Sequence, residues 1–331
     1  GSLLAPVSIL WDMAGFYDTI QLAPLLRDAL GRDFPPQVLL LETLVHLAPR
    51  VLRGRQRKCT MALYPEQPIL AGVRGAVDMA RCYLFVALDQ AHREFFPRGV
   101  STRSWVDDVV QRATGLADSI MAALTAAGKS FAEAVTSRRL TISPKSTATG
   151  TCARSVARAA TALRGAGLQL KTAVLAADLG IDRGTWRGAR RGPKATARWK
   201  SANRSWGRAA RLAKAAGLRT VGRMLMLSGS HAQARYSACV HGTPPTKVQQ
   251  LRCALGSVTT SEAAGLCLTT ALALDVGSRD PAYSVVFAVL QTWTGILEHS
   301  AEERARAVAA WAPACLLYTS PSPRDQRGSR M

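Results

Sequence analysis

Short apolar runs and amphipathic segments alternate along the first part of the chain. Residues 5–12, APVSILWD, form an apolar run that is suited to a buried strand. The apolar side chains of residues 19–30 recur at helical spacing, and Asp18 or Thr19 could cap that helix. Residues 36–52 predict a second helix, which begins at consecutive prolines.

The pattern continues with longer elements. Residues 75–95 predict a long helix, and residues 101–111 predict a hairpin with two adjacent aspartates at or near its bend. Residues 117–135 place their apolar side chains on one face of an amphipathic helix, and residues 140–151 return to strand character. The basic segment 53–70 predicts two short strands around a turn.

This order of elements predicts an α+β fold. Strand, helices, hairpin, helix, Asp-bearing hairpin, helix and strand make an antiparallel sheet with helices on one face. The first strand can then lie beside the Asp-bearing hairpin. In that arrangement Asp12 would meet the pair Asp107 and Asp108 at one edge of the sheet.

Charge narrows the class of partner. The 331 residues include 43 Lys and Arg against 22 Asp and Glu, a net charge of +21. Such an excess favours nucleic acid first and an anionic membrane surface second. The chain has no apolar stretch long enough to span a bilayer and no signal peptide, which predicts an intracellular protein, nuclear or cytoplasmic. Its seven scattered cysteines lack CxxC spacing and favour a reducing compartment without a zinc site.

The positive charge is concentrated in one region. Residues 183–261 contain no Asp or Glu, and tryptophans are interleaved among their many basic residues. Three arginines follow helical i, i+4, i+7 spacing and share a face. A solvent-exposed helix face usually carries both acidic and basic side chains. A face with basic side chains only therefore predicts contact with phosphates. The candidate nucleic-acid-binding residues are Arg198, Lys200, Arg204, Arg208, Arg211 and Lys214.

The adjacent Asp107 and Asp108 raise a separate question. Like charges repel, so the pair is either solvated at a turn or held by a cation. Short Asp-Asp motifs alone favour the solvated turn. The surrounding motifs change that balance.

Several motifs, taken in order, resemble reverse transcriptases of retroelements. DMAGFYD (12–18) is similar to the first palm motif, with a metal-binding Asp and an aromatic residue five positions on, and WVDD (105–108) is similar to the aromatic-x-Asp-Asp box. AGVRGAVDMA (71–80) stands where the Gly-rich motif should fall. LTISPKSTATG (140–150) resembles the later motif that carries a Lys, and LGIDRG (179–184) resembles the Leu-Gly turn beyond it.

The resemblance implies a polymerase palm that adds dNTPs to a DNA primer on an RNA (or DNA) template by two-metal phosphoryl transfer. Asp12 and Asp107 would bridge two Mg²⁺ ions, for which Mn²⁺ could substitute, and Asp108 would support them. Tyr17 would be the steric gate against a 2′-hydroxyl. Taken alone, Tyr17 is equally compatible with a half-buried core aromatic. Asp18 is better interpreted as a helix cap than as a ligand.

Other positions take roles from the same resemblance. Lys145 would neutralise or protonate the pyrophosphate, although an exposed strand-end lysine is the simpler interpretation. Gly72 and Gly75 would permit close approach of backbone to nucleotide or template, or they are ordinary turn glycines. The sequence departs from the family in lacking a Gln beside the glycine and in having Trp105 where Tyr or Phe is usual. Only eleven residues precede Asp12, so the fingers are expected to be largely missing.

The predicted organisation has four parts. Residues 1–182 form the palm and residues 183–260 a basic, helical, thumb-like region. Residues 261–314 form a helical C-terminal region. The tail 315–331 resembles a translated sequencing adapter and is set aside. The whole resembles the palm-and-thumb portion of a retroelement polyprotein.

Other functions remain open from the sequence. A decayed element would bind RNA or DNA without polymerising nucleotides. An RNA-directed RNA polymerase shares the palm chemistry, although Tyr17 as a bulky gate argues against it. A membrane-surface protein is disfavoured because the basic segments lack a wide apolar face. The oligomeric state is left open.

Overall fold

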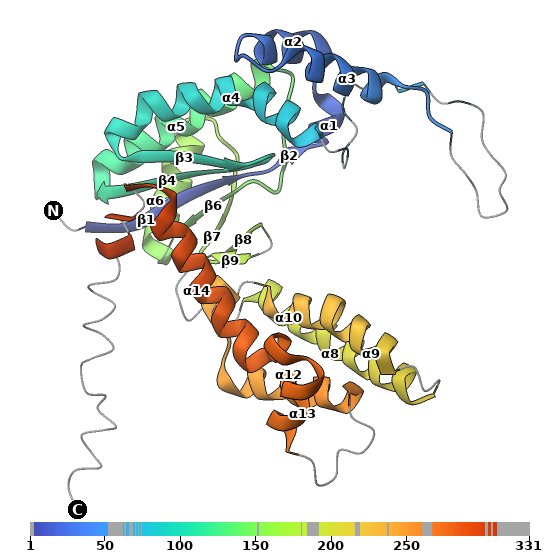
Figure 1. The fold of residues 1–331 in the computed structure, drawn as a ribbon. Coiled ribbons are helices and arrows are strands. Elements are labelled where there is room, and N and C mark those ends of the chain that lie inside the picture. Colours follow the sequence, from blue (N-terminus) through green and yellow to red (C-terminus); the bar gives the residue numbers. More distant parts are fainter. Residues whose placement is uncertain are drawn as a thin grey trace, which may run out of the picture. The chain divides into compact units, whose positions relative to one another are not determined.

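The protein was analysed as a computed structural model. The structure describes residues 3–51, 62, 64–65, 69, 71, 73, 75–150, 152–179, 181–183, 192–215, 219–236, 238–259, 267–301, 304–305 and 307–309. The chain divides into two compact units, Gly1–Gly192 and Pro193–Met331. Each unit is described by itself (Figure 1).

The first unit combines a sheet with helices. Its elements are β1 (Leu3–Trp11), β2 (Met13–Ala14), α1 (Phe16–Thr19), α2 (Leu22–Leu30), α3 (Pro36–Leu47), α4 (Ala76–Phe95), η1 (Phe96–Arg98), β3 (Val100–Trp105), β4 (Asp108–Leu116), α5 (Ala117–Ser137), β5 (Thr141–Ile142), β6 (Thr147–Gly150), α6 (Ala153–Gly165), β7 (Lys171–Ala173), β8 (Ala176–Asp178) and β9 (Ile181–Arg183). This mixture confirms the α+β class expected from the sequence.

Five strands form the main sheet in the order β3-β4-β1-β6-β7. The first strand lies beside the Asp-bearing hairpin, as predicted, because β1 pairs antiparallel with β4. The expectation of a wholly antiparallel sheet is wrong, because β7 pairs parallel with β6. The cause is a crossover: α6 connects β6 to β7, and a helical crossover returns the chain in the same direction. Two further pairs, β2-β5 and β8-β9, stand apart from this sheet.

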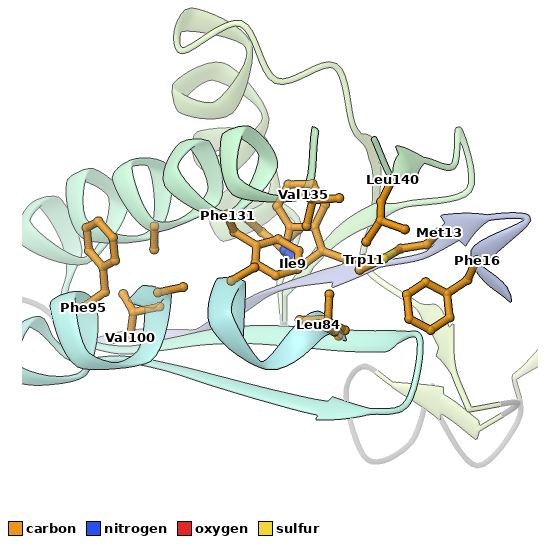
Figure 2. Close-up of a cluster of buried hydrophobic side chains, with 14 of the residues drawn as sticks. Ile9, Trp11, Met13, Phe16, Leu84, Phe95, Val100, Phe131, Val135 and Leu140 are labelled. Atoms are coloured by element: carbon orange, nitrogen blue, oxygen red, sulfur yellow. The ribbon is translucent and has the colours of Figure 1, made fainter. Parts of the chain in front are cut away.

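The helices α4, α5 and α6 pack as neighbours on one face of the sheet (Figure 1). Figure 2 shows the core that they enclose, in which Ile9 and Trp11 of β1 lie near Phe131 and Val135 of α5. A Cβ at Gly128 would come within 3.1 Å of the Ile9 side chain, so this glycine lets α5 lie close to β1. The core therefore fixes the strand from which Asp12 emerges.

Some local predictions fail or fall outside the structure. The cap assigned to Asp18 is wrong, because α2 begins after Gln21 and Asp18 lies inside the short helix α1. A break at Ile20 separates these two helices, where one continuous helix was expected. Most of the basic segment 53–70 and all of the tail 315–331 lie outside the described residues.

The second unit is helical in its described parts. Its elements are α8 (Pro193–Ala215), α9 (Arg219–Leu225), the π-helix η2 (Met226–His231), α10 (Ala232–Arg235), α11 (Ala238–His241), α12 (Pro245–Thr259), α13 (Leu268–Asp275), η3 (Gly277–Arg279) and α14 (Pro281–His299). Trp206, Met226, Leu251 and Leu255 are buried together in its core. None of the described helices of either unit is long and apolar enough to cross a membrane.

Candidate functional site

Strand register brings two of the predicted carboxylates together. Trp11, the last residue of β1, pairs with Val109 of β4. Extended by one residue, this antiparallel register places Asp12 opposite Asp108. Directly opposed residues have Cβ atoms roughly 5 Å apart. Asp12 and Asp108 are both half-buried, at the end of adjacent strands.

A serine turn holds the backbone of Asp12. The amide of Asp12 donates to the Ser146 hydroxyl at 3.0 Å, and the carbonyl of Asp12 accepts from the Ser143 amide at 2.8 Å. Both serines are buried, at 6% and 1% exposure for Ser143 and Ser146. The turn between them carries Lys145. The same turn that fixes Asp12 therefore also sets the position of the predicted pyrophosphate lysine.

A cavity of about 550 Å³ opens at this edge of the first unit. Asp12, Asp108 and Lys145 all line it, so the structure brings three of the predicted site residues to one place. Its remaining walls come from the ends of β1 and β6 and from β7 and β8. The residues that complete the lining are Leu10, Trp11, Thr147, Lys171, Thr172, Ala173, Leu175, Ala176, Ala177 and Asp178.

The neighbouring carboxylates affect the ionisation of Asp108. The pKa of Asp108 is raised from 3.8 to about 6, first by burial and then by the negative charges of Asp107, Asp178 and Asp12. A bound cation would favour the ionised form and oppose this rise. Asp12 and Asp108 thus offer carboxylates at a place where a bound cation would be stabilised.

Asp107 occupies the turn of the hairpin and does not line the cavity. It lies close enough to Tyr17 of α1 that its charge, after burial, raises the pKa of the Tyr17 hydroxyl. Arg81 of α4 acts on the same hydroxyl in the opposite direction. The Tyr17 ring packs edge-on against Phe16, with centroids 5.5 Å apart. The charge of Asp107 therefore acts both on Asp108 of the cavity and on Tyr17, the predicted gate.

The hairpin that presents these aspartates is strained. Trp105 pairs with Asp108 across a two-residue turn made of Val106 and Asp107. Val106 has a φ of 60°, in the left-handed region that β-branched residues rarely adopt. Such strain persists only where the surrounding fold imposes it, and it is common at functional sites.

A buried polar bridge supports the strands behind the site. The indole N–H of Trp11 donates to Gln111 Oε1 at 2.9 Å, and Gln111 Nε2 donates to the carbonyl of Ala127 at 3.1 Å. Gln111 has no exposed surface. It links β1, β4 and α5 immediately beside Asp12 and Asp108, and so helps to maintain their register.

Gly75 does not line the cavity. Gly75 precedes α4, and the space that a Cβ would take beside it holds the Glu42 carboxylate of α3. This close approach is to the protein's own side chain. Gly72 lies outside the described residues.

Two site residues were missed by sequence reasoning. Asp178, at the end of β8, is 7% exposed, lines the cavity and forms an ion pair with Arg183 of β9. Lys171, the first residue of β7, is exposed and lines the same cavity. Strands of three residues leave no usable periodicity. The only sequence signal was that Asp178 precedes the Leu-Gly turn.

The carboxylates that could bind a metal ion in this cavity offer oxygen ligands only. Within the described part of the chain, no three acidic, histidine or cysteine side chains gather closely enough to form a preformed metal cage. Mg²⁺ keeps several waters and is usually bound by one or two carboxylates together with substrate phosphates. The pair Asp12 and Asp108 fits that mode of binding.

The predicted basic residues separate into two groups on α8. Lys200, Arg204, Arg208, Arg211 and Lys214 are exposed. Arg198 is half-buried and lies over the Tyr236 ring, with its guanidinium carbon 5.0 Å from the centroid. The opposite face of α8 packs inward through Trp206, whose ring meets Trp199 at 5.3 Å. The exposed cations therefore form an open surface, while Arg198 is part of the packing.

Comparisons with known proteins do not assign the chain to a family. No protein-family model matches its sequence, and no curated protein matches it significantly. Function is therefore inferred from the residues that the fold brings together and from the sequence motifs that they occupy.

Proposed function

We propose that the chain is the palm and thumb portion of a retroelement-type reverse transcriptase, which synthesises DNA from dNTPs on an RNA template. The observation that supports this most is the meeting of Asp12 and Asp108 at adjacent strand ends, in one cavity with Lys145. These residues come from three separated motifs. The resemblance expects Asp12 to meet the Asp107–Asp108 pair, with Asp107 as the bridging partner, whereas it is Asp108 that lines the cavity beside Asp12.

The residues present suit the two Mg²⁺ ions that this reaction uses. Such ions clamp the attacking 3′-oxygen and the leaving pyrophosphate of an in-line displacement. Asp12 and Asp108 would hold them from the strand ends, and Asp107 would join them from the turn. Mn²⁺ has similar preferences for oxygen ligands and could substitute.

The other site residues would bind and orient the substrates. Lys145 and Lys171 both line the cavity, and their ammonium groups would balance the phosphate charge that builds up on the leaving group. Tyr17 would pack against the sugar and exclude a ribose 2′-hydroxyl. The exposed cations of α8 would hold the phosphates of the primer–template duplex.

Primer extension tests this proposal. The assay uses an RNA template and a DNA primer. Because the resemblance expects a fingers segment, the assay also includes a longer protein that carries the upstream residues encoded by the same gene. Asp108→Asn should lower Mg²⁺-dependent dNTP incorporation by roughly 10²–10³-fold, the scale of removing one group that stabilises transition-state charge. Glu133→Gln, an exposed carboxylate on α5, is the matched control and should leave the rate unchanged. Incorporation by Asp108→Asn at the parent rate would refute the metal-site assignment.

The open basic surface of α8 favours a second function, nucleic-acid binding without synthesis. A decayed element would keep its exposed cations and lose nucleotide addition. It would bind RNA or DNA with strong salt dependence and show no Mg²⁺-dependent incorporation. An RNA-directed RNA polymerase would instead use NTPs and dNTPs equally, and the primer-extension assay distinguishes these outcomes.

A further inference from the structure

A glycine lies at the midpoint of the exposed cations of α8. Lys200, Arg204, Gly207, Arg211 and Lys214 follow one another at intervals of four, three, four and three residues, so they form one straight line along the helix. All five are exposed. At 1.5 Å per residue the line is about 21 Å long, with Gly207 at its centre. We call these five residues the α8 row.

Packing within the protein does not require a glycine at this position. A Cβ built on Gly207 would meet no atom within 4 Å among the described residues. Gly222, in the same unit, is different: a Cβ there would lie 2.7 Å from the Cβ of Ala213 and 3.0 Å from Val258. Gly222 is explained by helix packing, whereas Gly207 is not. A glycine inside an exposed helix also lowers helix stability relative to alanine.

The neighbours of Gly207 suggest what approaches it. Arg204 and Arg211 lie one turn before and one turn after it, about 10 Å apart along the axis. Between these two long cationic residues the helix carries no side chain at Gly207 and presents bare backbone, and we call this position the gap. Residues 183–261 contain no carboxylate, so this stretch of the chain carries no negative side chain to repel an anionic ligand.

We propose that a nucleic-acid strand passes through this gap, with its sugar–phosphate backbone in contact with the α8 backbone at Gly207. Arg204 and Arg211 hold the phosphates on either side, and Lys200 and Lys214 extend the contact along the row. A methyl group at Gly207 keeps the strand away from the helix. This inference rests on the proposed nucleic-acid binding and adds the point of closest approach.

Substitutions at Gly207 test the gap without changing charge. Gly207→Ala should raise the melting temperature by about 2–4 °C, since alanine favours the helix. The same variant should bind a fluorescent RNA–DNA hybrid duplex roughly tenfold more weakly, and Gly207→Leu more weakly still. The salt dependence of binding should stay at the parent value, because no cation is lost. A single strand of the same length shows whether the contact needs a duplex.

Gly295→Ala on α14 is the matched control. Gly295 is also exposed, has no atom within 4 Å of its Cβ position among the described residues, and has no Lys or Arg within one turn along the sequence. This variant should gain stability and keep parent affinity. Parent affinity in Gly207→Ala and Gly207→Leu, with weaker binding in Arg204→Gln/Arg211→Gln, would overturn the gap and leave the basic surface standing. Parent affinity in Arg204→Gln/Arg211→Gln would overturn both.

Discussion

In the unit Gly1–Gly192 the candidate carboxylates are half-buried at the ends of paired strands, whereas in the unit Pro193–Met331 the candidate cations are exposed along one helix. The register of β1 and β4 places Asp12 and Asp108, and a core containing Trp11 supports that register. The cations of α8 need only helical spacing and solvent. Metal binding for a reaction at one phosphorus atom thus calls for carboxylates held rigidly and partly shielded from water. Electrostatic attraction of phosphates calls only for cationic side chains aligned on one exposed face.

The largest expected effect is a loss of nucleic-acid affinity when the exposed cations of α8 are neutralised. Neutralising three cations with Arg204→Gln/Arg208→Gln/Arg211→Gln should lower duplex affinity by roughly 10²–10³-fold at moderate salt, since each phosphate contact adds about 0.9 to the salt slope. The unfolding temperature should hardly change, because these side chains are exposed. Fluorescence anisotropy at several salt concentrations measures both the affinity and the slope. An unchanged slope would mean that these three arginines do not contact phosphates.

Arg223→Gln is the control for that experiment. Arg223 lies in the same unit and forms an ion pair with Asp275. Its loss should leave the salt slope of binding at the parent value.

The second effect concerns the stability of the unit Gly1–Gly192. Gln111→Leu should lower the free energy of unfolding by about 1–3 kcal/mol, because the buried indole N–H of Trp11 loses its acceptor. Urea denaturation measures this loss. Gln90→Leu, on the exposed surface of α4, should change stability little. Equal effects of the two variants would contradict a supporting role for Gln111.

The third effect is a pH dependence of stability. Burial and neighbouring carboxylates raise the pKa of Asp108 from 3.8 to about 6. Between those values the folded protein keeps a proton that the unfolded chain has released, so the free energy of unfolding falls as pH rises through this window. Asp108→Asn should therefore be more stable than the parent at neutral pH, by about 1 kcal/mol after allowing for solvent screening.

Thermal unfolding without divalent cations at several pH values measures that difference. The advantage of Asp108→Asn should disappear at the acid end of the window, where Asp108 is protonated and equally uncharged. A constant advantage at every pH would show that charge is not its cause.

The smallest effect concerns the strained turn. Val106→Asn should raise the free energy of unfolding by about 0.5–1 kcal/mol, because Asn tolerates the left-handed region better than a β-branched residue. Val106→Ala is the control: it removes similar packing without supplying a residue that favours this conformation. Chemical denaturation of the two variants separates them. Equal stability would mean that the turn is not strained.

Local patterns predicted much of the first unit. Apolar runs and helical spacing identified β1, α4 and α5, and the position of Asp107 and Asp108 at a hairpin bend was confirmed. These elements are long and their hydrophobic period is clear. The predicted meeting of β1 with the hairpin was confirmed for the same reason, because both strands are long enough to set a register.

Other features could not be predicted because they depend on packing distant in sequence. Lys171 and Asp178 reach the cavity from strands of three residues, which carry no periodic signal. The parallel pairing of β7 depends on the crossover through α6. The spacing of Lys200, Arg204 and Arg211 is visible in the sequence, but their exposure and the open space at Gly207 are not.

The most direct measurement of the central claim is the ionisation of Asp108 with and without Mg²⁺, followed by the carboxyl ¹³C resonance in NMR. We expect an apparent pKa of about 6 without the ion, falling well below that value when Mg²⁺ is added. Asp12→Asn should weaken this response. An Asp108 pKa near the ordinary 3.8, or one that Mg²⁺ leaves unchanged, would contradict the claim that these strand ends form a cation site.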